Sequence, residues 1–299
     1  MLLLLNIKTY IREKMKRYCV FLFMLAAAMM FTDVHAANLK SSNKAEGVPS
    51  RKVLAQIHPW YGARVAFLGD SQTDPRNSGS KKKYWGFLSE WLDIQPYVYG
   101  ISGQQWSHIP AQVEKLHQEH GTDVDAILIL MGTNDYNHGV RIGQWYEEGD
   151  TVVEAAYGQM KRKELRHYRR FSYDPNTFRG GINIAMRIIK EYYTDKQVIL
   201  LSPVHRACFD AGDKNLQPEE NIESRGGLYQ DAYVESVKEA GNVWAVPVID
   251  TNALTGFFPL IQGTVYYHNA KDLLHPNDAG HERLAKTLLW QLSKLPCRF

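Results

Sequence analysis

Two short, wholly apolar runs constrain the fold of this chain more than any other feature. Residues 65–68 (Val-Ala-Phe-Leu) and residues 126–131 (Ala-Ile-Leu-Ile-Leu-Met) contain no polar position. A short apolar run without alternation is typical of a strand that is buried on both faces, as in a parallel sheet covered by helices. The sequence therefore predicts an α/β fold built around these two strands.

The segments around these two strands alternate between strand and helix patterns. Further strands are predicted at residues 96–99, 197–201 and 243–249. Helices are predicted at residues 84–92, 108–120, 181–193, 227–240 and 279–295. Five strands that alternate with helices indicate a doubly wound parallel sheet with helices on both faces.

Two long connections interrupt this rhythm, at residues 136–178 and 202–224. Connections longer than about 12 to 15 residues in a compact domain are usually functional or mobile. Both leave the carboxyl ends of predicted strands, which is the edge where open α/β sheets bind ligands. We therefore expect both connections to form walls or a lid over a site at that edge.

Residues 1–36 have the features of a signal peptide. Lys16 and Arg17 precede an apolar stretch at residues 19–31, and Val-His-Ala at residues 34–36 offers small residues for cleavage. The stretch is shorter than the roughly 20 residues that span a bilayer, so export to the periplasm or the extracellular space is favoured over a membrane anchor. Because Met15 directly precedes the basic pair, it is an alternative start of the leader.

The composition of the remaining chain indicates one domain and no nucleic-acid partner. Residues 37–52 are rich in Ser, Asn, Lys and Gly and predict a flexible tether, and residues 53–299 are enough for a single domain with one large core. The chain carries 35 Lys and Arg against 32 Asp and Glu, and this basic excess falls within residues 1–36. A mature chain without a basic excess argues against nucleic-acid binding.

Two cysteines, Cys208 and Cys297, remain after the predicted leader. In an oxidising compartment such a pair permits either a disulfide or two free thiols, and the sequence leaves both open. The chain has no Cys-x-x-Cys motif and no His/Cys spacing typical of a metal site, so we expect no metal.

Three short segments together supply the reactive groups of an ester hydrolase. Gly-Asp-Ser71 follows the first apolar run, Gly-Thr-Asn134-Asp follows the second, and Asp272-Leu-Leu-His275 precedes the last predicted helix. The carboxyl ends of parallel strands meet at one edge of the sheet, so these segments are expected to lie close together. They would provide a nucleophile, an oxyanion donor, and a base with its orienting carboxylate.

His275 is the best candidate for the base because Asp272 stands three residues before it. On one tight turn the carboxylate can reach Nδ1 of the same imidazole and leave Nε2 facing Ser71. The Asp-x-x-His segment also lies beyond the last predicted strand and just before the last predicted helix, which returns it to the catalytic edge of the sheet, and the strongest rival, His205, follows the fourth predicted strand. The rivals are His108, His138, His205, His268 and His281.

Attack on an ester carbonyl creates an oxyanion, and each donor fixed in place beforehand is typically worth about 3 kcal/mol. The candidate donors are the Ser71 amide, the Gly100 amide and the Asn134 side chain. Gly100 follows the second predicted strand in Tyr-Gly-Ile-Ser-Gly, where the missing side chain lets a backbone amide approach a ligand closely.

With these motifs in place, the chain resembles the SGNH hydrolases of the GDSL esterase/lipase family from about residue 61 to the final helix. The four blocks that carry the family's Ser, Gly, Asn and His match Ser71, Gly100, Asn134 and His275. The resemblance implies a flavodoxin-like three-layer α/β/α sandwich with a five-stranded parallel sheet. It also implies a catalytic serine, an oxyanion hole formed by the donors named above, no metal or cofactor, and a broad choice of esters.

Two positions depart from the family pattern, and neither is catalytic. Gln72 stands where the name-giving motif has Leu or Ile, and Val98 stands where an Asn often precedes the glycine of the second block. Gln72 can add a polar contact near the nucleophile. The loss of Asn at position 98 removes a hydrogen bond from the loop.

The first long connection carries aromatic residues among basic ones, a mixture able to stack on sugar rings and hold polar groups. The alternative is that these aromatics pack the connection onto its own domain. We expect an esterase that removes acetyl or other short acyl groups from carbohydrate. The candidate substrate-binding residues are Gln72, Asp135, Trp145, Tyr146 and His205.

Other functions remain open at this point. The same catalytic groups would serve a lysophospholipase or short-chain lipase, or an acyltransferase in which a sugar hydroxyl replaces water. A different class of protein, an exported glycan-binding protein with little turnover, would keep the sheet and its crevice. In each case the expected partner is a small-molecule or glycan ester, with no nucleic acid and no membrane span after leader removal.

Overall fold

The computed structural model describes residues 47–158, 160–212, 214–262 and 266–298. The chain divides into two units, Met1–Ser50 and Arg51–Phe299, and the second contains the sheet, its helices and all the candidate site residues. The predicted leader at residues 1–36 lies outside the described residues, as does the predicted tether up to residue 46. Residues 51 and 52, which the sequence assigns to the tether, begin helix α2 (Arg51–Ile57), because this segment buries Leu54 despite its polar composition.

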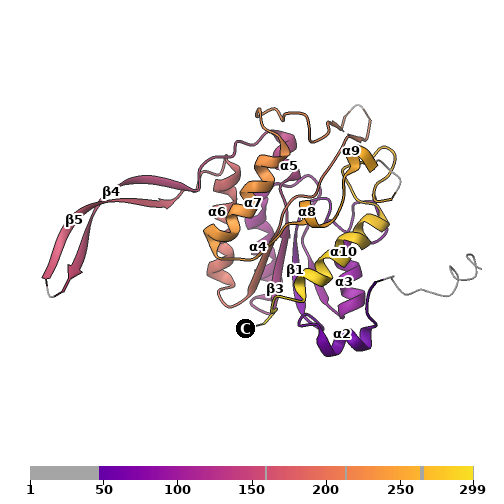
Figure 1. Cartoon of the computed structure of the whole chain (residues 1–299), viewed down its shortest axis with the longest axis horizontal. Helices are drawn as coiled ribbons and strands as arrows, with labels where there is room; N and C mark the ends of the chain where they lie inside the picture. The colour runs from indigo at the N-terminus through magenta and orange to yellow at the C-terminus, as the bar shows by residue number, and fades with distance from the viewer. Residues whose placement is uncertain (1–46, 159, 213, 263–265, 299) are drawn as a thin grey trace, which may run out of the picture. The chain divides into compact units, whose positions relative to one another are not determined.

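A five-stranded parallel sheet forms the centre of this unit (Figure 1), with the strands in the order β2-β1-β3-β6-β9. The strands are β1 (Arg64–Gly69), β2 (Gln95–Val98), β3 (Ala126–Leu130), β6 (Gln197–Leu201) and β9 (Val248–Ile249). Every residue of β3 and β6 is buried, which explains the apolar sequence of β3 and of residues 198–201 in β6. The strand order reverses between β1 and β3, where α/β sheets of this kind bind their ligands.

Helices cover both faces of the sheet, so the predicted three-layer α/β/α fold is confirmed. The longer helices are α3 (Tyr84–Leu92), α4 (Ile109–His120), α6 (Phe178–Tyr192), α7 (Gln230–Trp244) and α10 (Asp278–Leu292). The shorter ones are the 3₁₀ helix η1 (Trp106–His108), α5 (Thr133–His138), α8 (Thr251–Leu254) and α9 (Pro259–Gln262).

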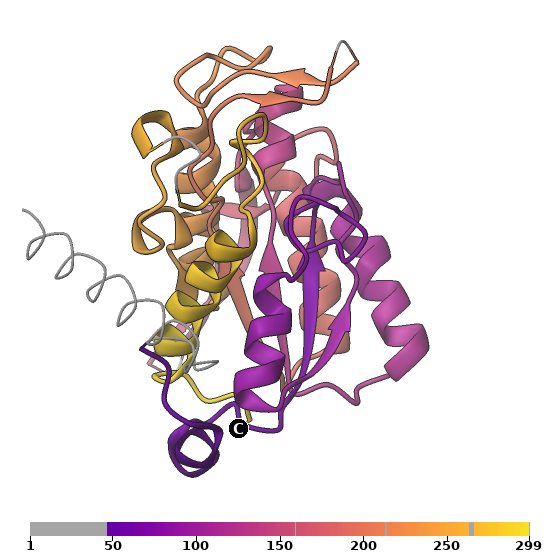
Figure 2. The same ribbon diagram turned by 90° about the vertical axis from the view of Figure 1, so that its right-hand side faces the viewer.

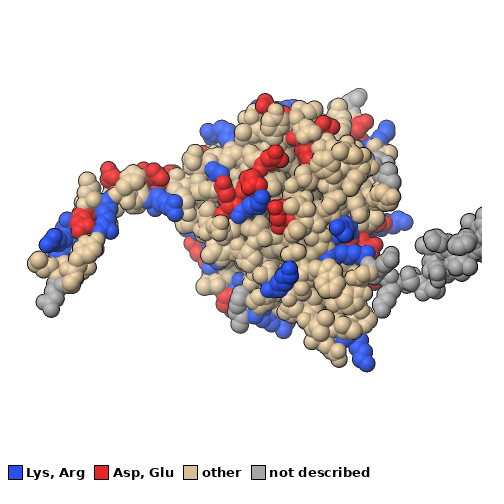
Figure 3. All heavy atoms as spheres, viewed as in Figure 1, with Lys and Arg blue, Asp and Glu red and all other residues tan. Residues whose placement is uncertain are grey.

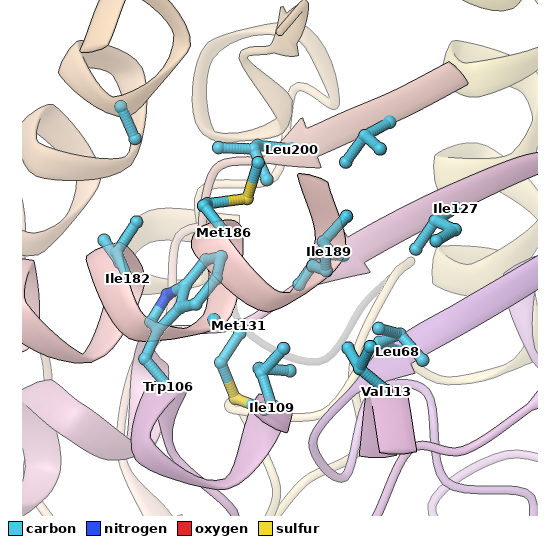
Figure 4. Packing of buried hydrophobic residues seen from close by; sticks show 14 of the residues in the cluster. Leu68, Trp106, Ile109, Val113, Ile127, Met131, Ile182, Met186, Ile189 and Leu200 are labelled. Atoms are coloured by element: carbon cyan, nitrogen blue, oxygen red, sulfur yellow. The ribbon is translucent and has the colours of Figure 1, made fainter. Parts of the chain in front are cut away.

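The main core lies between the sheet and the layer formed by α4, α6 and α7. In Figure 4, Val113 of α4 and Ile189 of α6 pack near Leu68, Ile127 and Leu200 of the strands. On the opposite face α3 packs against α10, and Phe67 of β1 meets the ring of Tyr84 edge to face. Alternate residues of each strand therefore serve the two layers.

The last strand is shorter than the sequence predicts. Of the predicted strand at residues 243–249, only Val248–Ile249 is extended, because Val243 and Trp244 complete helix α7. The ring of Trp244 stacks on Phe171, with the ring centres 4.4 Å apart, and its Nε1 donates to Asn183 Oδ1. These tertiary contacts outweigh the local strand preference of Val and Trp.

The connection at residues 136–178 was predicted as a wall or lid of the site, and this prediction is wrong for the part beyond helix α5. Most of it forms an antiparallel hairpin of β4 (Tyr146–Tyr157) and β5 (Met160–Phe171) that extends away from the central sheet (Figure 1). Acidic residues lie on β4 and, apart from Glu164, basic residues lie on β5, and the hairpin carries both red and blue atoms in Figure 3. Pairs such as Glu147–Arg170 cross the ladder. Such cross-strand pairs favour a hairpin over an irregular loop.

Cys208 and Cys297 are both free thiols, the first exposed and the second buried, so the disulfide alternative is not realised. The buried thiol donates to the carbonyl oxygen of Pro59. Within the described part of the chain, no helix has both the length and the apolar character needed to cross a bilayer.

Leu200→Ala is expected to lower the free energy of unfolding by about 2–5 kcal/mol, because it opens a cavity in the core around β6, where Leu200 is fully buried. The matched change Leu254→Ala, at a position that is 42% exposed, should cost less than about 1 kcal/mol. Urea denaturation of both variants checks this, and equal losses would contradict the proposed core.

Candidate active site

Ser71 lies in a tight turn at the carboxyl end of β1. A Cβ atom at Gly69, the last residue of the strand, would lie 2.5 Å from the carbonyl oxygen of Leu130 on β3, so only glycine fits there. The carbonyl oxygen of Asp70 accepts hydrogen bonds from the amides of Thr73 and Asp74. The strand therefore ends abruptly, and Ser71 sits at the sheet edge where the strand order reverses.

The structure brings Ser71, His275 and Asp272 into one hydrogen-bonded chain. The Nε2 atom of His275 lies 2.7 Å from Ser71 Oγ, and Nδ1 lies 2.9 Å from Asp272 Oδ2. Asp272 Oδ1 also accepts the amide of His275 at 2.8 Å, which holds the turn together. This is the arrangement in which an imidazole can take the proton of a serine hydroxyl.

Asp272 is ionised in this arrangement. Burial pushes the pKa of its carboxyl upward, but the hydrogen bonds and the electrostatic attraction from His275 outweigh burial and hold the pKa below its usual value. The carboxylate therefore fixes the Nδ1–H tautomer of His275 and leaves Nε2 free to accept a proton from Ser71.

The candidate oxyanion donors gather around the same turn. A Cβ atom at Gly100 would lie 2.6 Å from the Cβ of Thr73, so the backbone after β2 passes in contact with the turn that carries Ser71. Asp74 joins the two loops, because its Oδ2 accepts the amide of Ser102 at 2.8 Å. The sequence alone did not single out Asp74.

Asn134 is held in place from the opposite side. Its Nδ2 donates one hydrogen to the carbonyl oxygen of Gln104 at 3.0 Å, which leaves the second Nδ2 hydrogen for a ligand. Gln112 links Gln104 to the end of β1, because its side chain bonds both the amide and the carbonyl of Gly69 and also the Gln104 side chain. The sequence signal for these hydrogen bonds was Gln112 itself, a polar residue on the apolar face of α4.

The second long connection, residues 202–224, does form a wall of the site. It contains the short strands β7 (Phe209–Asp210) and β8 (Leu216–Gln217). Its backbone bonds to the turn that carries the base, with the Ala207 amide donating to Leu273 O at 2.9 Å. The ring of Phe209 meets the imidazole of His275 edge to face, with ring centres 5.1 Å apart. The sequence did not identify this contact.

Of the predicted substrate-binding residues, Gln72 is the chain neighbour of the nucleophile, and His205 belongs to the second long connection. Gln72 is buried beside the nucleophile, its amide donates to Asp70 Oδ1, and its Oε1 has no hydrogen-bond partner among the described residues. His205 is partly exposed, and its Nδ1 lies 2.6 Å from Glu220 Oε1, which raises the pKa of the imidazole.

The other three predicted substrate-binding residues are placed elsewhere. Asp135 is buried, where its carboxylate accepts the amide of Trp106, and burial raises the pKa of this carboxyl well above its usual value. Trp145 is buried in the core and donates to Glu239 on α7, and Tyr146 packs on Phe171. In the described residues no contact joins either ring to Ser71, because both anchor the β4–β5 hairpin.

The remaining histidines do not compete for the role of base. His268 and His281 are buried, and burial lowers the pKa of His268 to about 4 and that of His281 well below its usual value. Both are therefore neutral at neutral pH, and within the described residues neither is bonded to a carboxylate. The Nδ1 atom of His138 lies 2.8 Å from Asn134 O, and that of His108 accepts the amide of Gln105.

Comparison with known proteins identifies the family. The sequence matches the model of the GDSL-like lipase/acylhydrolase family over residues 67–283, a span that contains Ser71, Gly100, Asn134 and His275. The chain belongs to the GDSL-like lipase/acylhydrolase family. Membership implies ester hydrolase activity. Curated protein sequences give no significant match.

Solved structures show the same fold as this GDSL-like chain. A protein from Lactobacillus plantarum is 22% identical, with a TM-score of 0.59, over 78% of this chain and 97% of that one. A possible lipase from Chitinophaga pinensis is 18% identical, with a TM-score of 0.58, over 78% of this chain and 98% of that one. At these identities the likeness establishes the fold alone.

No group of three or more His, Cys, Asp or Glu side chains within the described residues of this GDSL-like chain could hold a metal ion. The site itself presents a hydroxyl, an imidazole, a carboxylate and a side-chain amide.

Asp70 should make the stability of this GDSL-like protein depend on pH. Burial raises the pKa of its carboxyl from 3.8 to about 6, so the folded state holds a proton that the unfolded chain releases at lower pH. Stability should fall by up to about 3 kcal/mol as pH rises from 4 to 7. Asp70→Asn keeps an acceptor for the Gln72 amide and should not show this fall in stability with rising pH.

The measurement is the free energy of unfolding of both proteins by urea at several pH values. The difference between Asp70→Asn and the wild type should grow in favour of the variant as pH rises through 6. A difference that stays constant from pH 4 to 7 would contradict the raised pKa.

Proposed function

We propose that the protein is a serine ester hydrolase that removes acetyl or other short acyl groups from carbohydrate through an acyl-enzyme on Ser71. The observation that carries this proposal is the hydrogen-bonded chain from Asp272 through His275 to Ser71, with His275 Nε2 at 2.7 Å from Ser71 Oγ. Membership of the GDSL-like lipase/acylhydrolase family supports the same reaction class.

The geometry supports a two-step reaction. As Ser71 Oγ attacks the ester carbonyl carbon, His275 Nε2 takes the hydroxyl proton, and the carbonyl oxygen becomes an oxyanion. The Ser71 amide, the Gly100 amide and the free Nδ2 hydrogen of Asn134 are the donors available to it. When the bond to the alcohol oxygen breaks, His275 gives that oxygen its proton, and the acyl group stays on Ser71.

Water completes the cycle. It attacks the acyl carbonyl carbon while His275 Nε2 takes one of its protons, and the same donors bind the second oxyanion. The bond to Ser71 Oγ then breaks, His275 returns the proton to the serine, and the carboxylic acid leaves. Asp272 stays ionised throughout and stabilises the imidazolium that forms in each step.

The polar surroundings of the nucleophile support a small, polar ester over a long-chain lipid. Asp70 and Gln72, the chain neighbours of Ser71, are buried, as is Asn134, and the ring of Phe209 packs on the base. Burying these groups against a long alkyl chain would leave polar atoms unpaired, which costs free energy. Export to the periplasm or the extracellular space stays a prediction from residues 1–36.

Ser71→Ala should reduce hydrolysis of 4-nitrophenyl acetate by about 10⁶-fold in kcat, because the nucleophile is lost. The wild type should also cleave the acetate ester faster than the octanoate ester. Ser293→Ala, at an exposed serine in the C-terminal region, is the matched control and should keep full activity. Full activity of Ser71→Ala would refute the proposal, and a preference for octanoate would refute the short-acyl part of it.

His275→Ala should abolish activity as thoroughly as Ser71→Ala, whereas Asp272→Ala should cost less, about 10⁴-fold, because a base without its orienting group remains. The control is His167→Ala on the β4–β5 hairpin, where an exposed histidine also lies 2.9 Å from an aspartate. The measurement is kcat on 4-nitrophenyl acetate. Wild-type rates for His275→Ala would remove His275 from the mechanism.

A further inference from the structure

A cavity of about 470 Å³ lies between the end of helix α5 and the second long connection. Residues 136–138 of α5 form one side of it. Residues 214–218, which include β8, and residues 223–225 form the other side. In Figure 2 the segment that contains β7 and β8 lies across this end of α5.

Two walls of this cavity belong to elements that also carry or contact residues of the candidate active site. Helix α5 carries Asn134 in its first turn and the cavity residues Tyr136–His138 in its second. Strand β8 pairs with β7, and Phe209 of β7 forms a bridge with Asp272 and packs its ring on His275. The walls of the cavity are therefore continuous with both the oxyanion donor and the base.

A buried arginine holds the two walls at a fixed separation. Arg206 has no exposed surface, and its Nη1 donates to Thr133 Oγ1 at the start of α5. Its Nη2 donates to Gln217 Oε1 on β8 at 2.9 Å. The guanidinium also lies 5.5 Å from the ring of Tyr136, whose hydroxyl donates to Ile222 O at 2.6 Å. A cavity braced in this way is largely formed before a ligand arrives.

The lining of the cavity is polar and mixes donors with acceptors. Amide groups and cationic groups outnumber the single acid, Glu223, and the apolar part is limited to Tyr136, Leu216 and Pro218. The amides and cationic groups belong to Asn137, Asn215, Gln217, Lys214 and Arg225, and His138 adds an imidazole. An amide offers both a hydrogen-bond donor and an acceptor, and a sugar hydroxyl can pair with both. An alkyl chain would contact little apolar surface in this cavity.

We propose that this cavity binds the alcohol part of the ester, a sugar, while the acyl group occupies the space at Ser71. This inference rests on the proposed function and adds the place where the leaving sugar is held. Asn137 and Arg225 are the residues expected to contact its hydroxyl groups, because neither side chain has a hydrogen-bond partner among the described residues. Arg206 is a positioning residue that keeps the sugar site in register with Asn134.

The test compares two acetate esters that differ only in their alcohol. One is 4-nitrophenyl acetate, and the other is the best substrate from a panel of mono-O-acetylated glucose, galactose and xylose. In the double variant Asn137→Ala/Arg225→Ala, the ratio of kcat/KM for the sugar ester to kcat/KM for the nitrophenyl ester should fall about tenfold or more. The loss should lie mainly in KM, since the variant removes contacts to a group that does not react.

The control is the double variant Asn242→Ala/Arg162→Ala, which makes the same two changes at exposed positions on α7 and β5 and should leave the ratio as in the wild type. An unchanged ratio in the cavity variant would overturn the cavity proposal alone. A wild type that cleaves the nitrophenyl ester but no sugar ester would overturn both the cavity proposal and the carbohydrate part of the proposed function. Retained nitrophenyl acetate hydrolysis in Ser71→Ala would instead overturn the proposed function, so the two failures are distinguishable.

Discussion

The site depends on one hydrogen bond, between His275 Nε2 and Ser71 Oγ, which joins residues 204 positions apart in the chain. The sheet positions Ser71, because β1 ends at a glycine that packs closely against β3 and Ser71 follows it where the strand order reverses. Local bonds position His275. Asp272 accepts the His275 amide, and Asn277 caps α10 by accepting the Gly280 amide at 3.0 Å.

Burial gives the carboxyl groups around this bond different roles. Asp272 is kept ionised by His275, while burial raises the pKa of Asp70 to about 6 and that of Asp135 well above its usual value. Under mildly acidic conditions Asp272 therefore carries a negative charge, whereas Asp70 and Asp135 are largely protonated. Asp70 and Asp135 instead accept backbone amides, from Gln72 and Trp106, and so hold the loops on either side of the nucleophile.

The sequence predicted the central features well because they rest on local rules. The apolar runs lie within one residue of β1 and β3, and the spacing of Asp272 and His275 predicted a contact that one turn can make. The sequence-based predictions failed where tertiary packing determines the structure. Trp145 belongs to the core instead of a sugar platform, Trp244 extends a helix, and the charged residues of β4 and β5 form a hairpin because they pair across strands that no local pattern joins.

The most direct test of the central claim is to map the reactive serine with a fluorophosphonate, from which a serine oxygen displaces fluoride at phosphorus. Intact-mass measurement and peptide sequencing should find a single adduct, located on Ser71, and His275→Ala should slow its formation by orders of magnitude. Labelling of another residue, or equally fast labelling without His275, would contradict the account of Ser71 as a nucleophile activated by His275.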